Sequence, residues 1–305
     1  MHKIAFVVPT KDRPDDLRKL LFSIASQTRK PDQLIIVDGS SPDIRHVIEE
    51  FPDLEFDYVR VYPPSLSKQR NTGMQQLKPE ITLAGYLDDD IVLEPSAIDA
   101  MLEFWSSAPA DIGGAAFSIT NALPAKYLHL KKLFLIDSPL PGKMLLSGFP
   151  STIGFQRSNI ESAWLYGGAT VWRREIVEQF SYDEWFLGTG FMEDVDFSYA
   201  VRKSYRLIVV AGSRLAHYSY PVKLEREALL GKWQIVNRMY FVRKNQGRGL
   251  SLSAAWVASI GITFLNAGIG LLRMRKNYRL RAKGNISGMF SELVGKRGPL
   301  GGHLK

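Results

Sequence analysis

The sequence contains no cysteine among its 305 residues, which excludes disulfide bonds and metal sites built on thiolates. Its first residues also lack the pattern of a signal peptide. The apolar stretch at residues 4–8 is short, Pro9 ends it, and no small-residue cleavage site follows. We therefore expect a cytoplasmic protein, and the absence of disulfides is compatible with that location.

Excess charge is missing from most of the chain. Residues 1–272 hold 30 basic and 30 acidic residues, whereas residues 273–305 hold nine Lys or Arg and only one acid, Glu292. The net charge of +8 therefore belongs to the C-terminal tail. A neutral body argues against nucleic acid binding, and a basic tail favours an anionic partner such as a membrane surface.

Apolar runs and helical patterns alternate in the first third of the chain. Strands are expected at residues 4–8, 34–37, 56–61 and 81–87, and helices at 14–24, 67–77 and 95–105. This alternation is typical of an α/β protein with a mostly parallel sheet and helices on both faces. Ligands bind beyond the carboxyl ends of such strands, where Thr10, Asp38 and residues 88–90 fall.

Three consecutive carboxylates, Asp88, Asp89 and Asp90, follow the expected strand at residues 81–87. Like charges this close repel one another and resist desolvation, so a cation is expected to compensate them. Mg²⁺ or Mn²⁺ fits best, because these ions take oxygen ligands and bridge to phosphates. The sequence therefore predicts a divalent metal site at this strand end.

Five motifs make the chain resemble the family 2 glycosyltransferases of bacterial surface-glycan type. In chain order they are Pro9–Pro14, Ile36–Ser41, Ser67–Gly73, Leu87–Asp90 with Pro95, and Glu193–Asp196. Members of that family transfer a sugar from a nucleotide-sugar to a hydroxyl, with inversion at the anomeric carbon. The resemblance implies a Rossmann-like GT-A catalytic domain over residues 1–245. It leaves residues 246–305 as a separate basic region with a helical, membrane-associating segment.

The resemblance also implies which residues hold the donor and the metal. The nucleotide would be held by Thr10, Arg13, Asp38, Arg70 and Asp88. The metal would be held by Asp90, with Asp88 and His217 as further candidates. Asp89 has the least defined role and is expected to be structural. For His217 the alternative is a structural histidine, since a lone histidine is more often that than a ligand.

The second acidic motif is expected to supply the catalytic base. By the resemblance, Asp194 would take the proton of the acceptor hydroxyl, and nearby carboxylates would raise its pKa. The residues expected near the acceptor or the donor sugar are Glu193, Asp196, Trp164, Gly167 and Gly168. Taken without the family, the acidic residues are equally typical of a helix start and the glycines of a turn, and most tryptophans lie in a core.

Residues 121–163 show no clear periodicity and contain four prolines. A stretch of this length inside a compact domain is typical of a lid or binding loop, which would carry much of the specificity. A surface insertion is the equal alternative.

Residues 249–272 form an uncharged run of 24 positions, which is long enough to cross a membrane. Basic residues flank the run on both sides, and more of them follow it than precede it. A single span would therefore put the more basic flank outside, against the positive-inside tendency. A helix in the plane of the inner leaflet keeps both flanks on anionic lipid. The alternative is a buried helix of a soluble domain.

Together these features predict a metal-dependent inverting glycosyltransferase, hexosyl- or deoxyhexosyl-specific, that is peripheral or monotopic on the inner face of the cell membrane. Its acceptor would be a lipid-linked or growing surface glycan. One alternative is a sugar-nucleotidyltransferase, but such enzymes usually carry a glycine-rich loop after the first strand, and residues 9–14 contain no glycine. The other is a catalytically inactive, membrane-associated glycan-binding protein, which would not need both acidic motifs.

Overall fold

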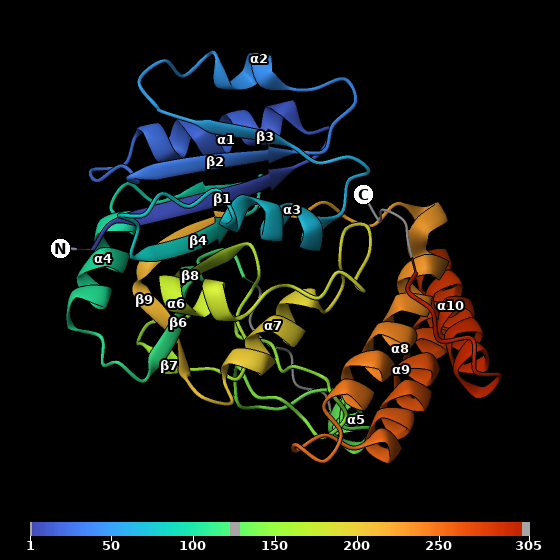
Figure 1. Ribbon diagram of the computed structural model, residues 1–305. Coiled ribbons are helices and arrows are strands. Elements are labelled where there is room, and N and C mark those ends of the chain that lie inside the picture. The colour runs from blue at the N-terminus through green and yellow to red at the C-terminus, as the bar shows by residue number, and fades with distance from the viewer. Residues whose placement is uncertain (1, 123–128, 301–305) are drawn as a thin grey trace. The chain divides into compact units, whose positions relative to one another are not determined.

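The computed structural model describes residues 2–122 and 129–300 (Figure 1). Contacts divide the chain into two compact units. The first comprises Met1–Pro124, Ile153–Glu184 and Glu193–Ser219, and the second comprises Ala125–Thr152, Trp185–Met192 and Tyr220–Lys305. The expected functional boundary near residue 245 stays a prediction.

A nine-stranded mixed sheet forms the centre of the first unit, counting the described residues. Its strands are β1 (Ile4–Thr10), β2 (Gln33–Asp38), β3 (Asp57–Arg60), β4 (Leu83–Leu87), β5 (Ile91–Leu93), β6 (Ile112–Ile119), β7 (Ile160–Glu161), β8 (Ala169–Arg173) and β9 (Arg206–His217). The order is β3-β2-β1-β4-β8-β6-β9-β5, and β7 pairs with β9.

The parallel character expected from the sequence belongs to one part of this sheet. Strands β3, β2, β1 and β4 run parallel to one another, and β6 runs parallel to β9. Strand β8 lies antiparallel between β4 and β6, and β5 and β7 are antiparallel to β9. The sheet as a whole is therefore mixed.

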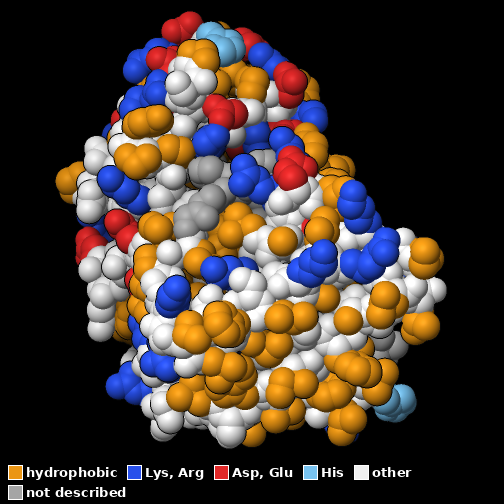
Figure 2. All heavy atoms as spheres, turned by 90° about the vertical axis from the view of Figure 1, so that its right-hand side faces the viewer, with side chains coloured by type: hydrophobic (Ala, Val, Ile, Leu, Met, Phe, Trp, Pro, Cys, Tyr) orange, Lys and Arg blue, Asp and Glu red, His pale blue; other side chains and the backbone are white. Residues whose placement is uncertain are grey.

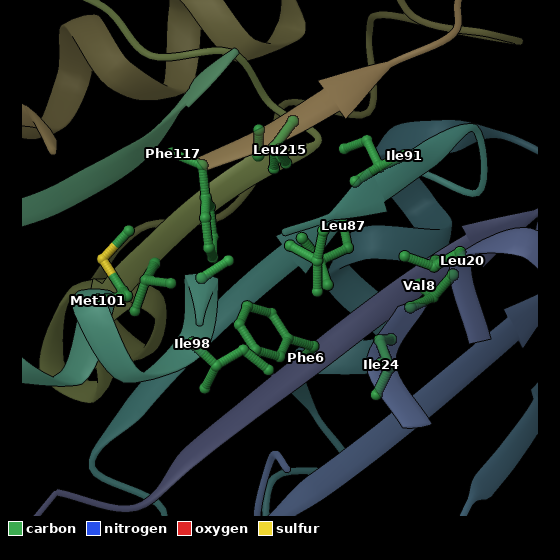
Figure 3. Close-up of a cluster of buried hydrophobic side chains, with 14 of the residues drawn as sticks. Phe6, Val8, Leu20, Ile24, Leu87, Ile91, Ile98, Met101, Phe117 and Leu215 are labelled. Carbon is green, nitrogen blue, oxygen red and sulfur yellow. The ribbon is translucent and has the colours of Figure 1, made fainter. Parts of the chain in front are cut away.

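Helices cover both faces of the sheet. The helices of the first unit are α1 (Pro14–Ala25), α2 (Arg45–Ile48), α3 (Leu66–Met74), α4 (Ala97–Ser107), α6 (Arg174–Gln179) and α7 (Glu193–Val201). Phe6 and Val8 of β1 point into a buried cluster formed with α1 and α4 (Figure 3). Val7 points to the opposite face, where a Cβ on Gly73 of α3 would come within 2.3 Å of it.

Helices are the main regular elements of the second unit among the described residues. It contains α5 (His129–Leu133), the short 3₁₀ helix η1 (Leu224–Arg226), α8 (Glu227–Lys244), α9 (Leu252–Leu272) and α10 (Lys276–Leu293). Helix α9 forms most of the uncharged run at 249–272, and its length and composition would allow it to cross a membrane.

Candidate active site

Polar residues meet at one edge of the sheet, at the ends of three neighbouring strands. Thr10 ends β1 and is the register partner of Asp38, which ends β2. Asp88 follows the last residue of β4, the other neighbour of β1. The parallel pairing of these strands therefore brings together the side chains that the sequence predicted at strand ends.

Asp89 binds the loop after β1 to the loop after β4. Its carboxylate accepts hydrogen bonds from Thr10 Oγ1 and Arg13 Nη1, each over 2.9 Å. Only 4% of Asp89 is exposed, and this burial raises the pKa of its carboxyl to about 7, although Arg13 opposes the shift. The least defined of the three aspartates thus fixes two residues that are expected to hold the nucleotide.

Asp88, Asp90 and His217 form a group that could hold a metal ion. One ligand atom from each lies within 4.8 Å of the others, and His217 Nε2 is 2.8 Å from Asp90 Oδ1. The second oxygen of Asp90 lies 3.3 Å from Arg13 Nη1. Two carboxylates and one imidazole are donors that suit Mn²⁺ and can serve Mg²⁺. This donor set therefore fits the divalent ion that the sequence predicted.

Strand pairing explains why His217 reaches this group. His217 is the register partner of Ile91, the residue that follows Asp90, in the antiparallel pair β5–β9. Asn121 then fixes the backbone of His217, donating to its carbonyl oxygen over 2.9 Å and accepting from its N–H over 3.0 Å. No local pattern in the sequence points to Asn121, because this contact depends on a long-range pairing.

Helix α3 anchors the site through consecutive side chains. Gln69 Nε2 donates to the carbonyl oxygens of Thr10 (2.9 Å) and Val37 (2.8 Å), which joins the ends of β1 and β2. Asn71 Nδ2 donates to the carbonyl oxygen of Tyr182 over 2.9 Å, and the Tyr182 N–H returns a bond of 2.9 Å. Arg70 lies between Gln69 and Asn71 in the chain, so these hydrogen bonds hold its backbone on both sides.

Arg70 is a buried cation, 1% exposed, that bridges the two acidic motifs. Its Nη2 donates to Asp88 Oδ1 over 2.9 Å, and its Nη1 donates to Glu193 Oε1 over 3.0 Å. Its guanidinium also lies 5.0 Å from the ring centre of Tyr182. Burial alone would lower the pKa of Arg70, but Tyr182, Asp88 and Glu193 raise it by more, so the side chain stays charged.

Gly167 and Gly168 give the space for this close packing. A Cβ on Gly168 would lie 1.9 Å from Asp88 Cγ, and one on Gly167 would lie 2.6 Å from Arg70 Nη1. The backbone N–H of Asp88 also donates to the carbonyl oxygen of Gly168 over 3.0 Å. Glycine is therefore needed here because any side chain would displace Asp88 or Arg70.

Replacement of Gly168 by alanine is expected to lower the free energy of unfolding by about 1–3 kcal/mol, as overpacking of a filled space does. Thermal or denaturant unfolding would measure the change. Gly212→Ala is the matched control, because a Cβ there meets only Ala100 Cβ at 3.9 Å. Equal stability of the two variants would contradict the close packing of Gly168 against Asp88.

The second acidic motif opens helix α7. Asp194 accepts hydrogen bonds from the backbone N–H groups of Val195 (2.8 Å) and Gly167 (3.3 Å), and burial raises its pKa. Burial and the neighbouring Asp194 also raise the pKa of Glu193, to about 8. A held carboxylate with a raised pKa is what general-base chemistry near neutral pH requires.

Stability is expected to depend on pH through Glu193. The Glu193 carboxyl binds its proton more tightly in the folded protein than in the unfolded chain. The free energy of unfolding should therefore fall as pH rises from about 4.5 to about 8. One such group contributes at most about 1.4 kcal/mol per pH unit, and Asp89 adds to the same slope. Glu193→Gln should flatten the slope in denaturant titrations. Exposed Glu103→Gln should leave it unchanged, and an unaltered slope in Glu193→Gln would contradict the assignment.

Three other expected site residues are buried in the first unit. Asp38 is fully buried and accepts from the Ser40 N–H (2.7 Å) and the Tyr58 hydroxyl (2.5 Å). Trp164 is 7% exposed and packs edge-on against Tyr166 at 4.7 Å, and Asp196 is 4% exposed within α7. Their expected contacts with the base, the donor sugar and the acceptor stay predictions.

Solved structures show that this fold is shared with other proteins. The mannosyltransferase PcManGT from Pyrobaculum calidifontis, in complex with GDP-Man and Mn²⁺, aligns with a TM-score of 0.56 at 15% identity, covering 96% of this chain and 88% of that one. Residues 1–349 of TarS from S. aureus align with a TM-score of 0.51 at 16% identity, covering 90% of this chain and 73% of that one. The GT-A fold expected from the sequence is confirmed.

Residues 5–180, more than half of the chain, match the profile described as Glycosyl transferase family 2. The chain therefore belongs to glycosyl transferase family 2, the family that its sequence motifs resemble.

Curated relatives are similar over part of their length. Glycosyltransferase GlyA of Streptococcus pneumoniae serotype 4 is 24% identical over 190 residues, covering 61% of this chain and 26% of GlyA. The O-antigen biosynthesis protein RfbC of Myxococcus xanthus is 25% identical over 231 residues, covering 71% of this chain and 17% of RfbC. The poly(ribitol-phosphate) beta-N-acetylglucosaminyltransferase TarP of Staphylococcus aureus strain N315 is 27% identical over 118 residues, covering 37% of this chain and 36% of TarP. The chain thus spans between about a sixth and about a third of the length of these relatives.

Proposed function

We propose that this glycosyltransferase is metal-dependent and inverting, and that it moves a sugar from a nucleotide-sugar to a hydroxyl of a lipid-linked or growing surface glycan. The observation that carries the proposal is the meeting of the two acidic motifs at Arg70, beside Gly167 and Gly168, where the absence of side chains lets Arg70 and Asp88 pack closely. Asp88, from the motif proposed to hold the metal and donor, and Glu193, the neighbour of the proposed base Asp194, thus bind the same cation.

The donor side is proposed to hold a nucleoside diphosphate and a divalent ion, Mn²⁺ or Mg²⁺. Asp88, Asp90 and His217 would hold the ion, which when bound would stabilise the negative charge developing on the diphosphate leaving group. The GDP-Man and Mn²⁺ complex of PcManGT, a protein of similar fold, supports this choice. The residues proposed to hold the nucleotide are Thr10, Arg13, Asp38 and Arg70.

The acceptor side is proposed to use Asp194 as the base. Inversion requires a base on the face of the sugar opposite the leaving group, and Asp194 would take the proton of the attacking hydroxyl onto a carboxylate oxygen. The N–H groups of Gly167 and Val195 orient that carboxylate, and its raised pKa favours proton acceptance. Glu193, held by Arg70, would fix the position of its neighbour.

The acceptor is proposed to be a surface glycan assembled at the inner face of the cell membrane. The names of two relatives, an O-antigen biosynthesis protein and a poly(ribitol-phosphate) transferase, support this class of acceptor. The basic charge of residues 273–305 would keep the enzyme near anionic lipid. In this proposal residues 1–245 carry catalysis and residues 246–305 associate with the membrane.

A donor screen tests the proposal. The full chain would be melted with a panel of nucleotide-sugars and nucleoside diphosphates, each with Mn²⁺ and with excess EDTA. One nucleoside diphosphate and its sugar are expected to raise the melting temperature with Mn²⁺ only, because a ligand that binds the folded state stabilises it. Transfer to a glycan acceptor with release of that diphosphate would distinguish the enzyme from an inactive glycan-binding protein. The proposal would be overturned if none of the nucleotide-sugars raised the melting temperature in the presence of Mn²⁺.

A further inference from the structure

Helix α9 buries small residues and exposes large apolar ones. Its buried residues are Ala254, Ala255, Ala258, Ser259, Gly261, Asn266 and Gly270. By contrast, Val257, Ile260, Phe264 and Leu271 are 44%, 55%, 73% and 65% exposed. A helix of a water-soluble domain normally does the reverse, turning its large apolar side chains to the core.

Helix α10 has the same inverted arrangement. Its buried residues are Ala282, Gly284, Asn285, Gly288, Ser291 and Glu292. Ile286, Phe290 and Leu293, spaced four and three positions apart, are 57%, 64% and 73% exposed. Two adjoining helices of the second unit thus place small and polar side chains inside and large apolar ones outside.

Close helix packing explains the small residues inside. A Cβ on Gly284 of α10 would lie 1.9 Å from the carbonyl oxygen of Ala228 in α8. Asn285, fully buried, donates to the carbonyl oxygen of Gly231 and accepts from Asn266 Nδ2, both over 2.8 Å. Close approach through small residues and amide hydrogen bonds between helices are the packing devices of helices in lipid.

The exposed side chains form a surface that we name the apolar face. It consists of Val257, Ile260 and Phe264 of α9 with Ile286, Phe290 and Leu293 of α10. Figure 2 shows hydrophobic side chains gathered over this side of the protein, with Lys and Arg side chains along the border of the gathering. A concentration of exposed apolar side chains on a folded protein marks a binding surface.

Positive charge identifies the partner of the apolar face. Lys244 and Arg248 precede α9, and Arg273, Arg275 and Lys276 follow it. A single span would place these two groups on opposite sides of a membrane, whereas a helix in the membrane plane puts both beside anionic headgroups. Large apolar side chains bordered by Lys and Arg are the pattern of interfacial helices.

We infer that the apolar face docks on the surface of an anionic bilayer, with α9 and α10 lying in the plane of the membrane. The inference deepens the proposed membrane location and depends on no role assigned to the donor, the metal or the base. Its tests therefore use lipid vesicles without donor or acceptor, so that a failure here leaves the proposed chemistry untouched.

Vesicle flotation of the full chain tests the docking. The protein is expected to float with vesicles of phosphatidylcholine and phosphatidylglycerol. Phe264→Glu and Phe290→Glu should each weaken binding at least about tenfold, since each removes a large apolar side chain from the bilayer. Phe22→Glu, at a side chain 68% exposed on α1 of the first unit, is the matched control and should bind as the wild type does. Wild-type protein that stays out of the floating fraction, or full binding by both α9 and α10 variants, would overturn the inference.

Cysteine labelling tests the orientation, because the chain contains no cysteine of its own. Single cysteines would replace exposed Ser253 and Met274, at the two ends of α9. A membrane-impermeant maleimide outside sealed vesicles should label both sites, whereas protection of one site would show a span and overturn the in-plane arrangement. If a second copy of the chain covers the apolar face, sedimentation without lipid should show a dimer that Phe264→Glu dissociates, and this would also overturn the inference.

Discussion

Asparagine in place of Asp194 is expected to abolish sugar transfer while leaving donor binding close to the wild-type value. The amide has nearly the same shape as the carboxylate and keeps one oxygen, which can still accept the shorter of the two backbone bonds, from the Val195 N–H over 2.8 Å rather than from the Gly167 N–H over 3.3 Å. It cannot take a proton from the acceptor hydroxyl, and loss of a general base lowers turnover by about 10²–10⁴-fold. Initial rates and donor affinity, measured on the same preparation, would separate the two effects.

The matched control for this substitution is Asp15→Asn in the first turn of α1, where the aspartate side chain is 85% exposed. That variant should transfer sugar at the wild-type rate. Substantial turnover by Asp194→Asn would show that another group accepts the proton, and weakened donor binding would place Asp194 on the donor side.

Removal of the divalent ion is expected to have an effect of similar size. Excess EDTA should lower transfer by about 100-fold or more, because the charge on the diphosphate leaving group would lose its main stabilising partner. Added Mn²⁺ should restore the activity of the wild type but not that of Asp90→Asn. In the wild type the Asp90 side chain is 2% exposed and lies 2.8 Å from His217 Nε2. His217→Ala should weaken Mn²⁺ affinity by at least about tenfold. Mn²⁺ titrations of activity and of binding would measure both.

The control for the metal experiment is Asp53→Asn, a change at an exposed residue of the first unit. It should leave the Mn²⁺ dependence unchanged. Full activity of the wild type in excess chelator would refute metal dependence while leaving the assignment of Asp194 open to its own test.

The sequence predicted the strand ends well, since their signals are local. An apolar run followed by a polar residue defines both the strand and its end, and parallel pairing then sets Thr10, Asp38 and Asp88 along one edge. His217 entered the prediction only through the resemblance to a family. The pairing of β5 with β9 that brings His217 to Asp90 leaves no local pattern in the sequence.

Contacts between distant residues were beyond what the sequence could predict. Strand β8 was not recognised, so neither was the approach of Gly168 to Asp88, which depends on the antiparallel pairing of β8 with β4. The hydrogen bond from Arg70 to Glu193 joins residues 123 positions apart. In α9 the apolarity was visible in the sequence, but the inverted burial depends on how α8 and α10 pack against it.

The bridge made by Arg70 has a consequence for chimeras of related transferases. Its guanidinium draws one carboxylate from the loop after β4 and another from the start of α7. A chimera that exchanges α7 for a segment without Glu193 would leave one buried N–H of Arg70 without its acceptor, and an unsatisfied buried donor costs about 1–3 kcal/mol. Chimeras designed for a new acceptor should therefore exchange α3 and α7 together, or keep Arg70, Asp88 and Glu193 unchanged.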